Sequence, residues 1–141
     1  MELNISHKGN IDNLKEANLI TSLRHIASEV RRSMVIEFCG EDDMAGECEQ
    51  ASIIMWKYIN DIKLVEPNQN KVVLGEFNGN GHIWNIVNGI YVDITVDQFG
   101  DYKWGVISNS DKYRYTIQKY MDYTKESSLL ETTDDFLAHI I

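Results

Sequence analysis

The chain has 141 residues, of which 43% are hydrophobic, 10% aromatic and 25% charged, and it contains a single proline. This composition excludes a disordered protein, and the length suits one domain with a sizeable core, so we expect a single domain over residues 1–141. Thirteen basic and 22 acidic residues give a net charge of −9, which repels phosphate and argues against a nucleic-acid partner. No apolar run is long enough for a membrane span, and residues 1–10 lack the apolar stretch of a signal peptide. We therefore expect a cytoplasmic location and no membrane partner.

The first half of the chain has helical periodicity. Apolar residues recur at steps of three and four between residues 11 and 34, which predicts an amphipathic helix with Arg31 among the charged residues elsewhere around it. Residues 39–46 have the composition of a loop, and a second helix is expected from 47 to 60. The apolar positions of the first helix are Ile11, Leu14, Leu19, Leu23, Ile26, Ala27, Val30 and Met34.

The second half of the chain has the two-residue alternation of strands. Strands are expected at 71–77, 82–87, 90–95, 104–107 and 113–119, with a turn at 78–81 and a short closing helix at 133–139. Helices followed by an antiparallel meander indicate an α+β fold, with the N-terminal helices packed on the sheet.

The dipeptide Asn88-Gly89 is a strong hairpin signal, and it fixes which residues face each other. Side chains alternate across a sheet, so His82 and Asp93 share one face as diagonal neighbours, about 7–8 Å apart between backbones. Such a pair places a titratable imidazole beside a carboxylate that can hold its tautomer. The alternatives are a plain surface pair or a one-residue slip that separates the two. The apolar character of the other face argues against the slip; that face carries Ile83, Asn85, Val87, Ile90, Val92 and Ile94.

Cys48 is the second candidate for chemistry, because it lies near the expected start of the second helix. Backbone N–H groups lack helical partners there and the helix dipole favours an anion, so the thiolate form is stabilised. The same N–H groups could hold an oxyanion after the thiolate attacks a carbonyl. Glu47 and Glu49 flank the cysteine and oppose this effect unless they point into water. A small buried hydrophobic role for Cys48 is the alternative.

Three segments resemble the transglutaminase-like proteins of the papain-like cysteine protease superfamily. They are Gly46–Ala51 for G-x-C-x-x-A, His82–Gly89 for H-x-W-(N/V)-x-V-x-G, and Tyr91–Phe99 for Y-x-D-x-T-x-x-Q-F. The resemblance implies a papain-like fold with a catalytic triad acting on amide carbonyls of a protein or peptide substrate. The chemistry would be that of a cysteine protease, a glutamine deamidase or a transglutaminase.

The resemblance and the order of the residues together assign roles to six side chains. Cys48 is the expected nucleophile, His82 the base and Asp93 the acid that orients the base. The other three are candidates for the substrate pocket or the oxyanion site: Trp84 as a pocket wall, together with Gln98 and Glu47, although Gln98 could equally cap a turn.

Other functions remain open at this level. An acidic, non-catalytic interaction module is the main alternative, because acidic residues crowd the cysteine and would suit a basic partner. A metal site built on Cys39, Cys48 and His82 lacks the usual ligand spacing and a fourth ligand, so we expect neither a metal nor a cofactor. A Cys39–Cys48 disulfide switch is a further possibility, but free thiols are expected in a reducing compartment.

Overall fold

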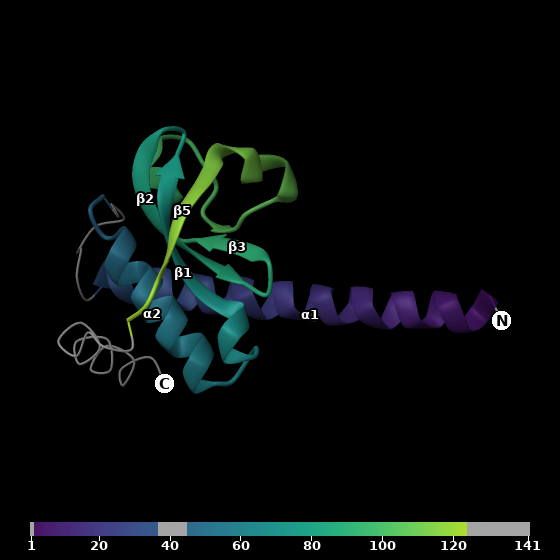
Figure 1. Cartoon of the computed structure of the whole chain (residues 1–141). Coiled ribbons are helices and arrows are strands. Elements are labelled where there is room, and N and C mark those ends of the chain that lie inside the picture. Colours follow the sequence, from purple (N-terminus) through teal and green to yellow (C-terminus); the bar gives the residue numbers. More distant parts are fainter. Residues whose placement is uncertain (1, 37–44, 124–141) are drawn as a thin grey trace.

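The computed structural model describes residues 2–36 and 45–123, with side chains described from residue 14 onward. Two helices precede the sheet, as the periodicity predicts (Figure 1). Helix α1 spans Glu2–Met34 and helix α2 spans Cys48–Asp61. Helix α1 thus begins nine residues before the expected residue 11 (11 − 2), and its N-terminal half extends beyond the rest of the molecule in Figure 1.

Five strands follow and form one antiparallel sheet, so the α+β fold class is confirmed. Their order across the sheet is β4-β3-β2-β1-β5, which makes β4 and β5 the two edges. The strands are β1 (Asn70–Phe77), β2 (Asn80–Val87), β3 (Ile90–Asp93), β4 (Gly105–Val106) and β5 (Tyr115–Met121).

Two asparagine–glycine turns join the first three strands. Asn88 and Gly89 have φ values of 50° and 81°, the left-handed conformation that a two-residue hairpin turn requires, and Val87 pairs with Ile90 as expected. Asn78 and Gly79 have nearly the same values, 48° and 81°. The expected four-residue turn at 78–81 is therefore wrong, because this second tight turn lets β2 begin at Asn80.

The later strands differ from expectation at their ends. Strand β3 stops at Asp93 rather than at residue 95, because the Asp93 carboxylate accepts a hydrogen bond from the backbone N–H of Thr95 and turns the chain. A short 3-10 helix, Val96–Phe99, follows. Another 3-10 helix occupies Asn109–Arg114, so β5 begins later than residue 113. The helix expected at 133–139 lies outside the described residues.

Each face of the sheet has its own core. Helices α1 and α2 pack on one face, against buried residues of β2 and β3 such as Val87 and Val92. The other face carries a mainly aromatic cluster that includes Phe77, Trp84 and Tyr115. Because both faces are buried, a polar side chain on the aromatic face needs a partner of its own.

Arg31, predicted among the charged residues that lie away from the apolar positions of α1, is buried. Its side chain is 2% exposed, and its guanidinium donates to both carboxylate oxygens of Asp97 at 2.7 and 2.8 Å and to the backbone oxygen of Ile94. The guanidinium also lies 4.8 Å from the ring centre of Trp104. These contacts stabilise the turn after β3 against α1, because a buried charge is retained only where it is paired.

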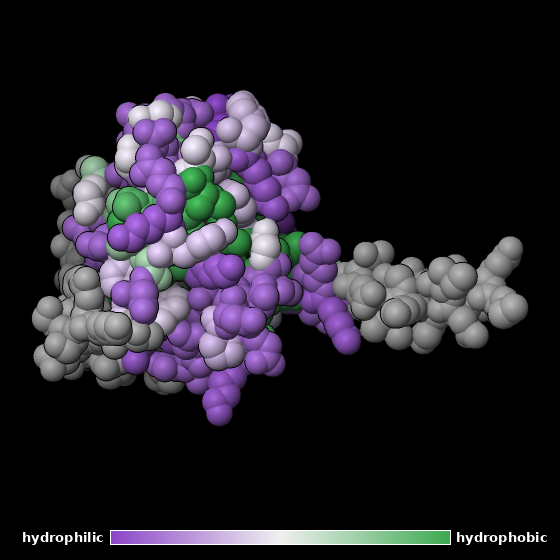
Figure 2. Space-filling view, viewed as in Figure 1, coloured by the Kyte–Doolittle hydropathy of each residue, from purple (hydrophilic) through white to green (hydrophobic). Residues whose placement is uncertain are grey.

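The surface in Figure 2 is mainly hydrophilic, with a small hydrophobic area near β1 and β5. Ile117 and Tyr120 of β5 are among the exposed large hydrophobic residues. Among the described helices, none combines the length and the apolar character needed to cross a membrane.

Candidate active site

A buried imidazole–carboxylate pair occupies the start of β2 and the end of β3. The Nε2 atom of His82 lies 2.7 Å from Oδ2 of Asp93, and the two side chains are 0% and 1% exposed. The hairpin explains the contact, since the Asn88-Gly89 turn and the observed register place both residues on the same face of the sheet. The structure therefore brings together the two residues that the sequence places side by side.

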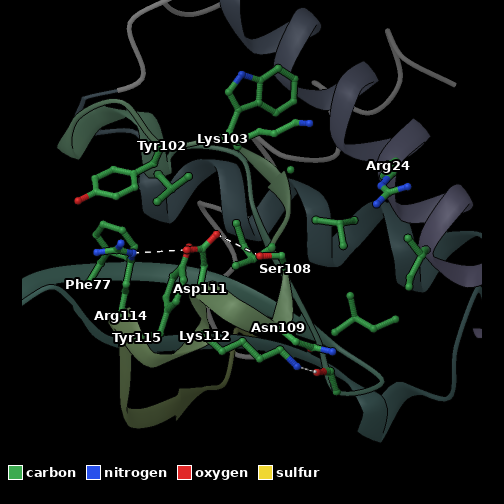
Figure 3. A pocket seen from close by; sticks show the side chains of 18 of the residues that line it. Arg24, Phe77, Tyr102, Lys103, Ser108, Asn109, Asp111, Lys112, Arg114 and Tyr115 are labelled. Atoms are coloured by element: carbon green, nitrogen blue, oxygen red, sulfur yellow. Dashed lines mark hydrogen bonds and ion pairs between the residues drawn. The ribbon is translucent and has the colours of Figure 1, made fainter.

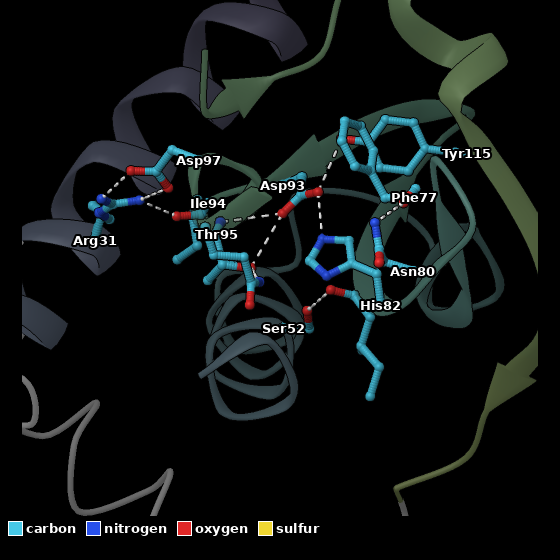
Figure 4. Close-up of polar contacts among 12 residues, drawn as sticks. Arg31, Ser52, Phe77, Asn80, His82, Asp93, Ile94, Thr95, Asp97 and Tyr115 are labelled. Carbon is cyan, nitrogen blue, oxygen red and sulfur yellow. Dashed lines mark hydrogen bonds and ion pairs between the residues drawn. The ribbon is translucent and has the colours of Figure 1, made fainter. Parts of the chain in front are cut away.

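Two further residues hold the Asp93 carboxylate in place (Figure 4). The hydroxyl of Tyr115, from β5, donates to Oδ2 at 2.9 Å. The backbone N–H of Thr95 donates to Oδ1 at 3.1 Å, and its hydroxyl lies 3.4 Å from the same oxygen. Asp93 thus accepts hydrogen bonds on both oxygens, which compensates for the burial of this polar side chain.

Cys48 is the first residue of α2 and is half-buried, with a free thiol. It is close enough to His82 to act on the imidazole both by hydrogen bonding and by charge. The Nδ1 atom of His82 is buried, and among the described residues no side chain other than Cys48 is available to bond it. One ring nitrogen therefore contacts Asp93, and the other is left for the thiol.

The ionisation of His82 reflects these neighbours. Burial disfavours the charged ring and would lower its pKa, but hydrogen bonds with Asp93 and Cys48 and the charges of both outweigh it and raise the pKa to about 9. At neutral pH the imidazolium form is favoured, and it can stabilise a thiolate on Cys48.

Aromatic rings enclose His82. Trp84 lies nearly parallel to the imidazole with the ring centres 6.0 Å apart, and Phe99 meets it edge-on at 4.8 Å. Trp84 is fully buried, so it contacts the imidazole directly rather than forming an open wall for a substrate. Such an apolar enclosure strengthens the electrostatic contacts inside it.

Gln98 and Glu47 are the two remaining candidates from the sequence. The Nε2 atom of Gln98 donates to the hydroxyl of Thr95 at 3.3 Å, which fits the turn-capping alternative for this residue. Glu47 precedes α2, and its backbone oxygen accepts from the N–H of Ala51 at 2.9 Å, while its side chain makes no capping hydrogen bond. The first-turn N–H groups of α2 are therefore not capped by Glu47.

Three of the acidic residues near Cys48 in the sequence, Glu41, Asp42 and Asp43, lie outside the described residues, and so does the second cysteine, Cys39. Glu49 accepts a hydrogen bond from the buried Tyr123 at 2.8 Å, which directs this carboxylate toward the end of β5. Within the described ranges, no cluster of three histidine, cysteine or acidic side chains could bind a metal ion.

A pocket of about 1000 Å³ lies apart from Cys48, between α1 and the β3–β4 edge of the sheet (Figure 3). Arg24, Lys103 and Lys112 are among the residues that line it, and neither His82 nor Asp93 is. Tyr115 contributes to its lining, so this tyrosine lies between the pocket and the buried carboxylate.

Sequence reasoning missed Tyr115 and Thr95 as partners of Asp93. Thr95 could have been found, because an aspartate that bonds the backbone two residues on is a common turn. Tyr115 could not, since its position depends on the pairing of β5 with β1, far from the hairpin in sequence.

Comparisons with family models, with curated proteins and with solved structures find no significant match to this chain.

Proposed function

We propose that this protein is a thiol hydrolase or acyltransferase that acts on amide bonds of a protein or peptide through Cys48, His82 and Asp93. The observation that carries the proposal is the buried His82–Asp93 contact of 2.7 Å, with the thiol of Cys48 within hydrogen-bonding range of the same imidazole. A nucleophile, a base and an orienting acid are thus available, with the base between the other two. The three segments that resemble transglutaminase-like proteins carry the same residues.

In the proposed reaction, the thiolate of Cys48, paired with the imidazolium of His82, attacks the amide carbonyl carbon. The oxyanion that forms is stabilised by N–H groups of the first turn of α2, where the positive end of the helix dipole lies. The imidazolium of His82 then protonates the departing nitrogen, the C–N bond breaks, and a thioester with Cys48 remains. Water or an amine gives a proton to His82 and attacks the thioester, and His82 returns that proton to the departing sulfur of Cys48.

Thiol reactivity tests the proposal before any substrate is known. Iodoacetamide reacts with the thiolate, and an ordinary thiol has a pKa of about 8.5, so its labelling at about pH 6.5 is slow. We expect Cys48 in a Cys39→Ser variant to react at least tenfold faster than Cys39 in a Cys48→Ser variant, as followed by intact mass. Similar slow labelling of both cysteines would contradict an activated Cys48 and leave the acidic interaction module as the alternative.

Intact-mass analysis of a panel of glutamine-containing peptides and primary amines distinguishes the possible reactions. Deamidation adds about 1 Da to the peptide, proteolysis divides it, and acyl transfer adds the amine. Cys48→Ala is expected to abolish whichever reaction is found while leaving the thermal unfolding transition intact. Turnover retained by Cys48→Ala would exclude Cys48 as the nucleophile.

A further inference from the structure

We infer that Tyr115 is a positioning residue of the proposed active site, whose hydroxyl fixes the orientation and the acceptor strength of Asp93. This inference rests on the proposed function for its catalytic consequence, but its physical claim concerns His82 and Asp93 alone. It adds a fourth side chain, contributed by the opposite edge of the sheet, to the three that the sequence singles out.

The contact itself is well defined. The hydroxyl of Tyr115 lies 2.9 Å from Oδ2 of Asp93, the same oxygen that bonds Nε2 of His82. One carboxylate oxygen is therefore shared between the phenol and the imidazole, and Thr95 holds the other oxygen. Because both sides of the carboxylate are bonded, Asp93 has little freedom to rotate away from His82.

The ionisation state of Tyr115 suits a donor. Burial and the neighbouring charge of Asp93 both raise the pKa of Tyr115 far above its ordinary value. The phenol therefore keeps its proton throughout the pH range in which a thiol enzyme works. Since Asp93 can only accept in its charged form, the direction of this hydrogen bond is fixed.

The surrounding rings hold the phenol in this position. Phe77 and Tyr91 contact the Tyr115 ring edge-on, with centres 5.0 and 5.4 Å away, and Trp84 lies at 4.9 Å. Trp84 also stacks on His82, so Tyr115 and His82 are packed against the same indole. Such packing limits the phenol to one orientation.

Tyr115 must weaken Asp93 as an acceptor for His82, because a hydrogen bond to the carboxylate stabilises its charge. Within residues 14–36 and 45–123, the charged and titratable groups that act on His82 are Asp93 from β3 and Cys48 from α2, and Tyr115 from β5 acts through Asp93. When the hydroxyl is removed, Oδ2 of Asp93 accepts from His82 alone. The carboxylate then stabilises the imidazolium more strongly, and the pKa of His82 rises. A merely structural tyrosine would leave that pKa unchanged.

The test is Tyr115→Phe, which deletes a single oxygen. The pKa of His82 is measured by NMR titration of labelled histidines in the full-length Cys48→Ala protein, where no thiol titrates with the ring. A His82→Gln variant identifies the signal. We expect Tyr115→Phe to raise this pKa by about half a unit or more. The matched control, Tyr91→Phe, removes a hydroxyl from the same cluster and should leave it unchanged.

An unchanged or lowered pKa of His82 in Tyr115→Phe would overturn the inference. With Cys48 present and a substrate in hand, the same substitution is expected to lower kcat about tenfold with KM unaffected, because the hydroxyl does not touch the substrate. An inactive wild-type protein would count against the proposed function alone, since the NMR titration does not depend on turnover. A change in kcat no larger than that of Tyr91→Phe would overturn the positioning role.

Discussion

At the residue scale, Asp93 performs two tasks with its two oxygens. Oδ1 accepts from the backbone N–H of Thr95 and ends β3, while Oδ2 accepts from Tyr115 and contacts His82. A residue that only turned the chain could be asparagine as readily as aspartate, since both form this turn. The buried imidazole and the phenol, by contrast, both donate to Oδ2. Only a carboxylate can accept hydrogen bonds at Oδ1 and at Oδ2 at the same time, because one of these two atoms is a donor in asparagine.

Asp93→Asn therefore separates the two tasks. The amide oxygen can still accept from Thr95, but the amide nitrogen then faces Nε2 of His82 as a donor, which moves the imidazole proton to Nδ1. A protonated neutral Nδ1 cannot take the proton of Cys48, so we expect turnover to fall by on the order of 10³-fold and iodoacetamide labelling of Cys48 to slow to the rate of an ordinary thiol. Stopped-time intact-mass assays measure both rates.

The exposed Asp101→Asn is the matched control for this charge change, and it should retain the wild-type rates. If Asp93→Asn also retained them, the orienting acid would have to be sought elsewhere. A folded Asp93→Asn variant, checked by its thermal transition, keeps that comparison valid.

At the scale of elements, prediction from sequence succeeds where contacts are local. The hairpin of β2 and β3 depends on two turn residues, Asn88 and Gly89, so its register and the His82–Asp93 contact could be worked out from alternation. The contact between Arg31 and Asp97 spans 66 residues, and nothing in the helical periodicity of α1 separates this arginine from its exposed neighbours. The pairing of β5 with β1 is also long-range, and it contains an irregularity between Leu74 and Gly75 that no simple register rule predicts.

The irregularity in the pairing of β1 with β5 lies at Gly75, where the two strands approach each other closely. Gly75 pairs with His82 across β1 and β2, and a Cβ placed on it would lie 1.9 Å from the backbone oxygen of Thr116 and 2.8 Å from the Trp84 ring. Backbone cannot yield as a flexible side chain can, so β5 packs closely on β1 only because this residue has no side chain.

We expect Gly75→Ala to destabilise the fold by about 3 kcal/mol, since β5 must shift to relieve the overlap. Urea denaturation followed by tryptophan fluorescence measures this change. Gly81→Ala is the matched control, because Gly81 also lies in the sheet but has open space at its Cβ position. Equal stability of the two variants would show that β5 does not approach β1 as closely as described.

At the scale of the whole molecule, the sheet separates two environments. The helices cover one face with aliphatic side chains, and the candidate site is enclosed by aromatic side chains on the other. Cys48 can join the site because it is the first residue of α2 and lies within hydrogen-bonding range of His82, while later residues of this helix, such as Ile54, pack on the helical face of the sheet. Folding therefore brings Cys48, His82 and Asp93 together, and the charge on His82 is coupled to the stability of the fold.

The sign of that coupling follows from the pKa of His82, which is about 9 in the folded protein and about 6.5 in an unfolded chain. Between these values the folded state holds one more proton on His82 when Cys48 does not supply it, so the measurement is made in a Cys48→Ala background. There this histidine contributes stability that is fully present below about pH 6.5 and is lost as the pH rises through its folded pKa, and we expect the free energy of unfolding to fall by at most about 1.4 kcal/mol per pH unit, measured by urea denaturation at a series of pH values. In His82→Gln on this background the slope should become flatter, whereas in His25→Gln, which removes an exposed histidine of α1, the slope should stay as in the parent protein. A slope that is identical in all three proteins would mean that His82 does not hold its proton in the fold, and the imidazolium–thiolate pair would lose its physical basis.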